Sequence, residues 1–584
     1  MIRKLVRQML AAQVFSALTV SLCLLIDNVM ISRFLGETSM AAYSLANPVL
    51  LAIGAIGSLL AAGIQVACSK SLGRGSQEET NAGFSSAVAL GGIISVAFAV
   101  LVIVFRSPLA SLMGAGQQGG LFEQTRDYLA GFSIGAPGSM GALVLVPFMQ
   151  MAGQSTLLIL AVLAMTVTDV ALDLLNVLVF HGGMFGMGLA SAVSYYAAMA
   201  VAAVYFFSSR SVFRFSRKLV TGRKIAELFS GGVPAGFNMA SSVILVYALN
   251  RILQGTGGET AVAAYAVISG IGNAANCITT GIGGVSLTLS GILYNEEDRN
   301  GLKDLVAQLC RTGVVLGLGM GILLLVFAPA FISLFIPEAG AMQDMAVLGL
   351  RLFAAGLIPC CVNNALKNMY QATGRTGLTE IISLLEGAVF PALAALAFSA
   401  LFGTTGAWLF FVTGEILTLL GIGLLIRRKT GRLPWRDGAF LLQEREAGAE
   451  DRLLETEIHS LEETEAFVKA AEQFCLTLGE DAQTANHIAL CIEEIAVNVV
   501  THGFTADEKP HHLAVRLLGR EDAWILRFRD DCKAFDPVRY VPEAGENAIG
   551  IRLVMAIAEK AFYTYSMNMN NLTLRLRRGS AGEE

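Results

Sequence analysis

Twelve apolar stretches constrain the fold of this 584-residue chain more than any other feature of its sequence. Each is long enough for a helix of about 20 residues, which spans the hydrocarbon layer of a bilayer and satisfies its own backbone hydrogen bonds there. The sequence therefore predicts an all-α polytopic membrane protein over most of its length. The stretches lie at residues 12–32, 45–69, 84–105, 128–150, 158–180, 186–207, 230–253, 261–292, 309–330, 349–371, 378–401 and 406–426.

Charge divides the chain into two parts. Residues 1–436 contain 26 Lys and Arg against 19 Asp and Glu, whereas residues 437–584 contain 15 against 27. The acidic C-terminal part disfavours nucleic acid as a partner, because a phosphate backbone is bound by basic groups. The nine cysteines are scattered without a CxxC pair, which predicts buried thiols rather than a metal site or a disulfide framework.

Basic residues gather in alternate connections between the apolar stretches. They precede the first stretch and follow the second, sixth, eighth, tenth and twelfth, whereas the opposite connections hold mostly single arginines. The positive-inside rule then predicts a multi-pass protein of the cytoplasmic membrane with both termini in the cytoplasm. The N-terminal sequence MIRKLVRQML lacks a small-residue cleavage site, so we expect it to be retained as the start of the first helix.

The two halves of the apolar part repeat one another. The sequence GET at residues 36–38 recurs at 258–260, and Pro137 recurs as Pro359, both at an offset of 222. A constant offset indicates a duplication, and transporters built from parallel repeats hold substrate near the midplane between two lobes. The repeat predicts two six-helix lobes at residues 1–208 and 230–428, joined by a cytoplasmic linker at residues 209–229.

Acidic residues inside the apolar stretches mark candidate sites. Asp169 and Asp173 are four residues apart and therefore share one helical face, and Asp27 lies in the first stretch. A charged side chain at the bilayer centre costs at least about 2.5–3.5 kcal/mol, so such residues usually serve a function. Glu386 and Glu415, in the last two stretches, are candidates to attract a cationic substrate. For all five residues, a structural hydrogen bond inside the bundle is the alternative.

Several motifs in residues 10–428 resemble the multidrug and toxic compound extrusion (MATE) family. They are IDN at residues 26–28, NP at 47–48, LGRG at 72–75, GMGLA at 186–190 and GGVP at 231–234. The resemblance implies an antiporter in the lipid bilayer that exports organic, often cationic, compounds in exchange for Na⁺ or H⁺.

The same resemblance implies a coupling-cation site in the N-terminal lobe. Asp27 and Asp173 match the family's acidic residues in the first and fifth spans. Ser191 or its neighbour Ser194, in the sixth span, is a candidate neutral oxygen ligand. Asp169 stands where many members have Asn. This extra carboxylate repels its neighbours, so at least one carboxyl group is expected to keep its proton. The residues do not choose between Na⁺ and H⁺.

Two other functions fit the apolar part. Lipid-linked saccharide flippases share the superfold, but they often line a central cavity with arginines, whereas the basic residues here lie almost all in predicted cytoplasmic connections. A membrane receptor that signals through the C-terminal part is the second alternative.

The C-terminal part predicts an α+β cytoplasmic domain at residues 453–580, after a polar linker at 429–452. Amphipathic periodicity predicts helices at 461–478 and 484–502, and alternation predicts strands at 512–518, 523–529 and 571–577. Helices that cover an antiparallel sheet would bury both apolar faces.

The pattern of polar residues and glycine in this domain resembles the motifs of the GHKL (Bergerat-fold) ATP-binding domains. The resemblance is strongest to the anti-sigma-factor serine kinases. Glu494 and Asn498 share a helical face, Asp530 ends a strand, and Gly550 opens a helix. The resemblance implies ATP with Mg²⁺ as cofactors, with Glu494 as catalytic base, Asn498 as Mg²⁺ ligand, Asp530 as adenine partner and Gly550 in the phosphate loop.

Three positions depart from the GHKL pattern. Cys532, Ala534 and Ala548 stand where the family has glycines that let backbone approach the nucleotide. Whether this domain is an enzyme, a kinase or ATPase, therefore stays open. The alternatives are an ATP-binding regulatory domain and a GHKL-like fold that binds a regulatory protein. The chain lacks a GxxxxGK[ST] phosphate loop, so we expect ion gradients rather than ATP to drive transport.

Overall fold

The computed structural model describes residues 2–115, 120–208, 211–336, 340–433, 435–442, 452–505, 509–541, 549–566 and 569–578. The chain divides into two compact units. One is helical and comprises Ile2–Arg74 and Glu78–Leu442, and the other is formed mainly by Gln443–Glu584. Ala548 and residues 443–451 of the predicted linker lie outside the described residues.

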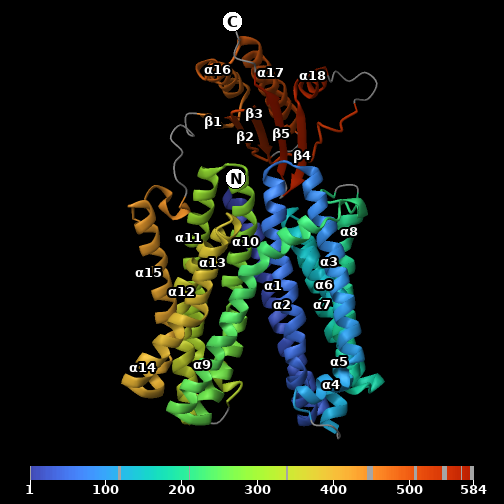
Figure 1. Ribbon diagram of the computed structural model, residues 1–584, viewed down its shortest axis with the longest axis vertical. Coiled ribbons are helices and arrows are strands. Elements are labelled where there is room, and N and C mark those ends of the chain that lie inside the picture. The colour runs from blue at the N-terminus through green and yellow to red at the C-terminus, as the bar shows by residue number, and fades with distance from the viewer. Residues whose placement is uncertain are drawn as a thin grey trace. The chain divides into compact units, whose positions relative to one another are not determined.

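The first half of the helical unit runs from α1 to α8 (Figure 1). Its elements are α1 (Ile2–Met30), η1 (Ile31–Leu35), α2 (Glu37–Gly73), α3 (Gln77–Val104), α4 (Arg106–Leu112), α5 (Gly120–Ile134), α6 (Ala136–Met151), α7 (Ser155–Leu175), η2 (Asn176–Phe180) and α8 (Gly183–Phe207). The η1 and η2 segments are π-helical turns that continue α1 and α7.

The second half contains the remaining helices of this unit. They are η3 (Arg217–Leu219), α9 (Gly222–Ala275), α10 (Cys277–Asn295), α11 (Arg299–Ser333), α12 (Ala341–Ala372), α13 (Thr376–Leu384), η4 (Leu385–Val389), α14 (Phe390–Ala407), α15 (Phe410–Thr430) and η5 (Arg436–Leu441). Within the described residues, 11 helices are long and apolar enough to cross a membrane, or 12 when the bent pair of α5 and α6 counts as one span. The predicted polytopic helical fold is confirmed at this level.

Two predicted spans differ in detail from the observed helices. The fourth is bent by 46° between α5 and α6, where Pro137 has no backbone N–H and disfavours helical geometry just before it. The eighth, predicted as one helix over 261–292, is interrupted at Asn276, where the helix that begins at Thr260 ends and α10 starts.

Glycines at matching positions end helices in both lobes. Gly36 (φ 86°) and Gly258 (φ 64°) are 222 residues apart, and each separates the first two spans of its lobe. A positive φ is strained for residues with a Cβ, so only glycine adopts it readily. The same relation holds, at offsets of 221 and 220, for the pairs Gly153 and Gly374, and Gly183 and Gly403.

The two lobes meet through small residues. A Cβ on Gly63 of α2 would overlap Leu228 O of α9, and one on Gly232 of α9 would overlap Leu59 O of α2. Helices without side chains at such points approach closely, as is common in membranes. These contacts lie toward the start of α9, near the linker between the lobes, and the ribbons of α1 and α9 diverge toward the opposite end (Figure 1).

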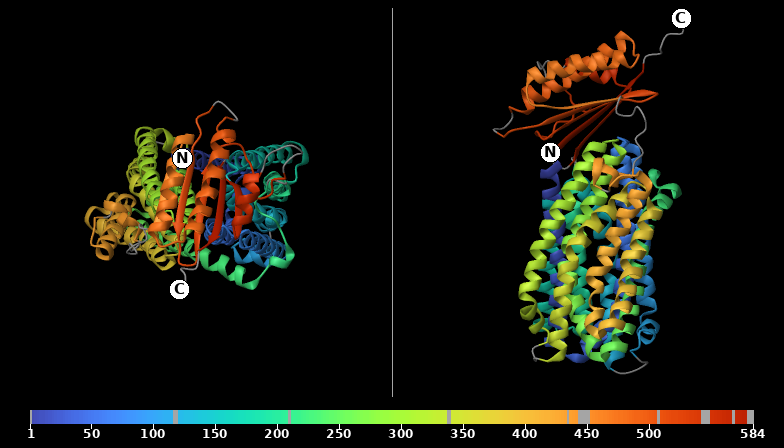
Figure 2. Two further views of the ribbon diagram at one scale, coloured as in Figure 1. Left: turned by 90° about the horizontal axis from the view of Figure 1, so that it is seen from above. Right: turned by 90° about the vertical axis from the view of Figure 1, so that its left-hand side faces the viewer.

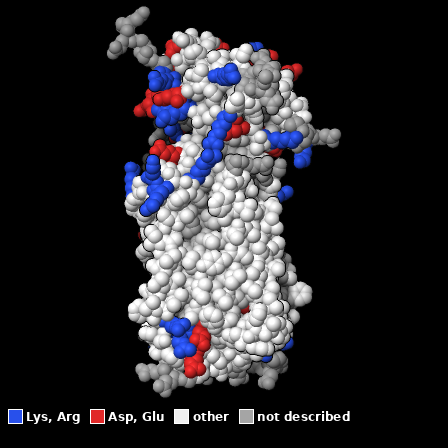
Figure 3. All heavy atoms as spheres, turned by 90° about the vertical axis from the view of Figure 1, so that its right-hand side faces the viewer, with Lys and Arg blue, Asp and Glu red and all other residues white. Residues whose placement is uncertain are grey.

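The outer surface of the helical unit is apolar. Val104, Val167 and Val315 are each at least 65% exposed on α3, α7 and α11. On the face that Figure 3 shows, a broad band over the helices has few coloured charged residues, and Lys and Arg gather near its upper end. Such a band is typical of a surface that faces lipid rather than water.

The C-terminal unit is a five-stranded antiparallel sheet with helices on one face (Figure 2). The strand order is β1-β2-β3-β5-β4, and Ile488, Ile492 and Val554 of the helices pack with Trp524 and Leu574 of the sheet. The elements are β1 (Leu453–Ile458), α16 (Leu461–Thr477), α17 (Ala482–Asn498), η7 (Val499–Gly503), β2 (Leu513–Gly519), β3 (Ala523–Asp530), α18 (Ile549–Ile557), β4 (Lys560–Ser566) and β5 (Met569–Arg577).

This unit confirms an α+β architecture and adds two strands to the prediction. The three predicted strands are β2, β3 and β5, which lie in the middle of the sheet. The missed strands, β1 and β4, are its edges. Edge strands carry more charged and exposed side chains, so their alternation in the sequence is weaker.

Candidate functional site

Buried carboxyl groups cluster where α1 packs against α7. Asp27 projects from α1, and Asp169 and Asp173 project from successive turns of α7; they are 8%, 3% and 0% exposed. One oxygen of Asp27, one of Asp169 and the sulfur of Cys23 lie within 4.8 Å of one another. Asp173 lies one turn after Asp169 on α7, within electrostatic range of Asp27.

The contacts of these carboxyl groups leave most of their oxygens unsatisfied. Cys23 Sγ donates a hydrogen bond of 2.9 Å to Asp169 Oδ2. Among the described residues, Asp27 Oδ1, Asp169 Oδ1 and both Asp173 oxygens accept no hydrogen bond. Buried polar atoms are normally paired, so these four orphan oxygens are the atoms of this lobe that could hold a proton or a cation.

Cys23 is the neighbour that the sequence prediction overlooked. It lies four residues before Asp27 and therefore on the same helical face. This spacing is the feature of the sequence from which the contact can be predicted. Ser191, the predicted neutral ligand, is half-buried on α8, where its carbonyl oxygen accepts a hydrogen bond from the Ser194 hydroxyl. Among the described residues, Ser191 forms no hydrogen bond with any of the three aspartates.

Aromatic side chains border the aspartates. Tyr43 packs edge-on against Tyr128 with a ring-centroid distance of 5.4 Å, and Phe132 packs between Tyr128 and Tyr195. All three tyrosines lie within electrostatic range of Asp27. This aromatic border limits water around the carboxyl groups, which raises the free-energy cost of leaving their charge uncompensated.

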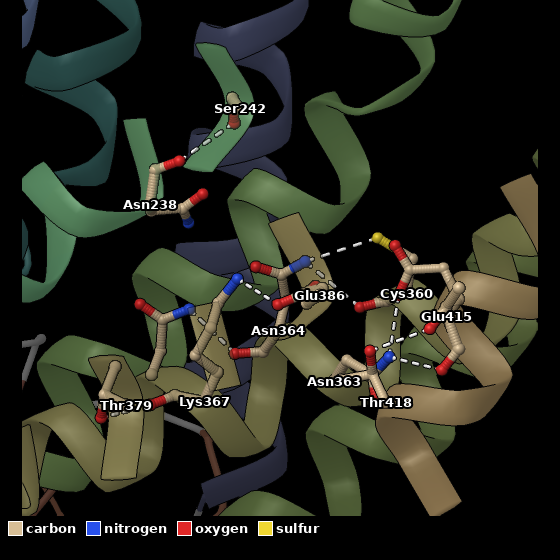
Figure 4. Close-up of polar contacts among 12 residues, drawn as sticks. Asn238, Ser242, Cys360, Asn363, Asn364, Lys367, Thr379, Glu386, Glu415 and Thr418 are labelled. Atoms are coloured by element: carbon tan, nitrogen blue, oxygen red, sulfur yellow. Dashed lines mark hydrogen bonds and ion pairs between the residues drawn. The ribbon is translucent and has the colours of Figure 1, made fainter. Parts of the chain in front are cut away.

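A second polar cluster lies in the C-terminal lobe (Figure 4). Lys367 of α12 forms an ion pair with Glu386 of η4, with Nζ 2.6 Å from Oε2, and the two side chains are 7% and 8% exposed. Lys367 lies near the end of the tenth apolar stretch and is one of the basic residues that the sequence predicts at a cytoplasmic helix end. In the structure it lies five residues before Ala372, where α12 ends. Its side chain is instead buried in the bundle, so one basic group was missed.

Glu415 of α15 lies beside this ion pair. Its Oε2 accepts a hydrogen bond of 2.8 Å from Asn363 Nδ2, and its carbonyl oxygen accepts another from the same amide group. One ligand atom each from Cys360, Glu386 and Glu415 lie within 4.8 Å. The C-terminal lobe therefore places one buried and one half-buried carboxyl group near one buried ammonium group.

Three of the predicted nucleotide-site residues approach one another in the C-terminal unit. Glu494 and Asn498 lie one turn apart on α17, and the Asn498 amide donates to Glu494 O at 2.7 Å. Gly550, the second residue of α18, lies so close to α17 that a Cβ there would overlap the Glu494 carboxylate. Gly503, at the end of η7, lies against Cys532, which follows the predicted adenine partner Asp530 in sequence.

Asp530 is 4% exposed at the end of the central strand β3. Its Oδ1 accepts hydrogen bonds from Asn570 Nδ2 at 2.7 Å and from Cys532 N at 3.1 Å. Burial raises the pKa of Asp530 above its ordinary value, although these two hydrogen bonds act in the opposite direction. Asn570, which also accepts a hydrogen bond from the Tyr563 hydroxyl at 2.6 Å, was not among the predicted site residues.

Known proteins resemble the helical unit in sequence and in fold. The chain is 26% identical over 416 residues to the multidrug export protein MepA of Staphylococcus aureus, a match that covers 70% of this chain and 89% of MepA. It is also 26% identical over 262 residues to the probable multidrug resistance protein NorM of Brucella suis, covering 42% of this chain and 54% of that protein.

Solved structures share the fold at low sequence identity. A MATE crystal structure in complex with MaL6 superposes with a TM-score of 0.68 at 20% identity, covering 73% of this chain and 96% of that one. A MOP superfamily transporter from Pyrococcus furiosus, described as having a binding pocket of reverse polarity, superposes with a TM-score of 0.65 at 19% identity, covering 72% and 94%.

The family model MatE matches the chain twice, at residues 13–175 and 234–396. The two matches have equal length and are 221 residues apart, which agrees with the duplication read from the sequence. Together they cover more than half of the chain, and both lie before the C-terminal unit. The chain therefore belongs to the MatE family.

Proposed function

We propose that this protein is a cation-coupled antiporter that exports organic, cationic compounds across the cytoplasmic membrane. The observation that carries the proposal is the cluster of Asp27, Asp169 and Asp173 with four orphan carboxylate oxygens. The names of two relatives, the multidrug export protein MepA and the probable multidrug resistance protein NorM, support export of drug-like compounds.

The charges of the aspartate cluster require a positive partner. In the part of the chain that the structure describes, none of the three aspartates forms an ion pair with Lys or Arg. Three buried carboxylates within one helix pair repel one another, so the site takes up protons or a metal cation such as Na⁺. Release of that ion to one side of the membrane and its uptake from the other would couple the site to the ion gradient.

Closure between the lobes supplies the second part of the mechanism. The lobes touch through Gly63 and Gly232 near the linker, while Val243 and Tyr247, farther along α9, are more than 60% exposed. We infer that the lobes open toward the end away from the linker, which is the outer side if the linker is cytoplasmic. Cation binding at α1 and α7 would shift these helices and thereby the packing of α1 against the second lobe.

The buried lysine bears on the flippase alternative. A lipid-linked saccharide carries phosphate, so a flippase needs unpaired basic groups in its cavity. Lys367 is already paired with Glu386, with Glu415 nearby, so the C-terminal lobe presents an excess of carboxylate. This balance favours a cationic substrate.

Export of a fluorescent organic cation tests the proposal. Cells that produce equal amounts of wild type, Asp27→Asn, Asp173→Asn or the control Asp127→Asn would be loaded with the dye, and efflux would be started with a Na⁺ or a proton gradient. Asp127 is 43% exposed on α5 and serves as the matched control. We expect export by wild type and the control and its loss in both buried variants. Efflux by Asp173→Asn at the wild-type rate would refute the coupling role.

We also propose that the C-terminal unit is a cytoplasmic, GHKL-like ATP-binding domain that regulates transport and binds a partner protein. The approach of Gly550 to Glu494, with Asn498 one turn away, supports a nucleotide site between α17 and α18. Binding of a fluorescent ATP analogue with Mg²⁺ to the full-length protein should be lost in Asn498→Ala and retained in Asn486→Ala, which changes an exposed Asn of the same helix. Equal binding by both variants would refute this assignment.

A truncation after residue 442, where the helical unit ends, separates the two proposals. If the helical unit is a self-sufficient antiporter, the truncated protein exports dye, and only its regulation by nucleotide changes. Loss of export with normal membrane insertion would show that the C-terminal unit takes part in transport itself.

A further inference from the structure

Two histidines and a glutamate meet on the surface of the C-terminal unit. His459 follows β1 and His512 precedes β2, and His459 Nε2 lies 3.2 Å from His512 Nδ1. One carboxylate oxygen of Glu457 and one ring nitrogen of each histidine all lie within 4.8 Å of one another. None of these residues takes part in the transport or nucleotide sites proposed above.

The strand register explains why the three side chains converge. Ile458 of β1 pairs with Leu513 of β2 in antiparallel register, so His459 and His512 continue the two strands opposite each other. Glu457 and His459 are two residues apart and therefore lie on the same side of β1. The backbone of two paired strands thus fixes the cluster.

The spacing of the two ring nitrogens fits one metal ion. Zinc binds histidine nitrogens at about 2.0–2.1 Å in tetrahedral geometry, which places two such nitrogens about 3.4 Å apart. The observed separation is 3.2 Å. Imidazole and carboxylate are ligands that zinc and related divalent transition metals accept, whereas Mg²⁺ and Ca²⁺ prefer oxygen ligands alone.

A second carboxylate orients the first histidine. His459 Nδ1 lies 3.4 Å from Glu463 Oε2, and the same oxygen accepts the His459 backbone N–H at 2.6 Å. Glu463 is held in place at the start of α16, where its own N–H is capped by Ser460 Oγ at 3.2 Å. A carboxylate on the far ring nitrogen is the usual support of a metal-bound histidine, because it fixes the tautomer and the ring orientation.

We propose that Glu457, His459 and His512 bind one divalent transition-metal ion of the zinc type, with water as the fourth ligand. The site is exposed, with the His459 side chain 47% accessible, so the ion can exchange with the solution. The backbone N–H of His512 donates to Asp531 Oδ1 at 3.0 Å, and Asp531 directly follows Asp530. Metal binding would therefore also restrain the end of β3.

Metal binding by the full-length protein in detergent tests this inference, which does not depend on the proposed transport function. Tag-free protein would be treated with a chelator, and Zn²⁺ binding would then be measured by equilibrium dialysis with elemental analysis. We expect one Zn²⁺ per chain, and a visible absorption spectrum typical of a tetrahedral site when Co²⁺ replaces Zn²⁺.

Variants locate the site. His459→Ala and His512→Ala should each weaken Zn²⁺ binding by at least tenfold, and Glu463→Gln by about 10-fold or more through loss of orientation. His487→Ala, which changes a half-buried histidine of α17 away from the cluster, is the control and should bind as wild type. Absence of Zn²⁺ binding at micromolar concentrations, or unchanged binding and an unchanged Co²⁺ spectrum in His459→Ala and His512→Ala, would overturn the inference.

Discussion

Replacement of Lys367 by methionine should destabilise the helical unit strongly. Methionine keeps the apolar length of the side chain but removes the ammonium group that lies 2.6 Å from Glu386 Oε2. Glu386, with a side chain only 8% exposed, would then be buried without its partner.

The magnitude follows from the burial of the pair. Two unit charges 2.6 Å apart attract by about 6 kcal/mol at an effective dielectric constant of about 20, a gain largely offset by the cost of removing both groups from water. Deleting one partner leaves the other's desolvation uncompensated, which costs about 3–5 kcal/mol. Replacing both partners by apolar residues of similar volume should cost much less, because no charge stays buried.

Unfolding in mixed micelles of detergent and dodecyl sulfate measures these differences. The free energy of unfolding would be compared among wild type, Lys367→Met, Glu386→Leu and the double variant, with Lys218→Met as an exposed control. We expect a loss of about 3–5 kcal/mol for Lys367→Met, a much smaller loss for the double variant, and a change within about 0.5 kcal/mol for the control.

A strictly additive double variant would refute this reasoning. Two independent losses that sum without interaction energy would mean that the two groups do not depend on each other. A loss below about 1 kcal/mol for Lys367→Met would likewise show that the pair behaves as a surface ion pair, whose contribution is about 0–1 kcal/mol.

Three further predictions concern backbone and burial. Gly258→Ala should destabilise the helical unit by about 1–3 kcal/mol, because its φ of 64° and ψ of −155° are almost restricted to glycine. No atom lies within 4 Å of a Cβ built there, so backbone strain is the whole effect. Gly255→Ala, in open helical surroundings, should not destabilise the unit, and thermal unfolding would compare the two variants. Gly550→Ala should displace the Glu494 carboxylate and weaken binding of the ATP analogue. Burial raises the pKa of Asp530 above its ordinary value, so the folded state holds this proton more tightly than the unfolded state does. The stability of the wild type should therefore fall as pH rises through that pKa, and hydrogen exchange of the β3 amides would measure the fall. Asp530→Asn should abolish it.

The helical fold and its repeat were predictable because their signals are local. An apolar length of about 20 residues specifies a span, and motifs at constant offset specify a duplication. The aspartate cluster was predictable in part, since Asp169 and Asp173 share a helix face within one segment. Cys23 and Asp27 have the same i, i+4 spacing, which places both on one helical face. The composition of the chain, by contrast, predicts only a buried thiol at Cys23.

The remaining site residues depend on contacts between distant segments. Lys367 lies near the end of its helix, where basic residues usually reach water, and its burial follows from packing of α12 against η4. Asn570 reaches Asp530 only because β5 pairs with β3 across 40 residues. No periodicity within either segment encodes these pairings, so the sequence alone did not reveal them.

The glycine pairs of the two lobes have a consequence for mutational tolerance. Glycines with positive φ end helices at matching positions of both repeats. A saturation mutagenesis scan should therefore find positions that accept only glycine in both lobes, 220–222 residues apart. The buried acids should break this periodicity, because the positions one repeat beyond Asp27, Asp169 and Asp173 hold Leu249, Phe390 and Ala394. Duplication has thus preserved the scaffold of both lobes while their chemistry diverged, and the two halves should not be interchangeable.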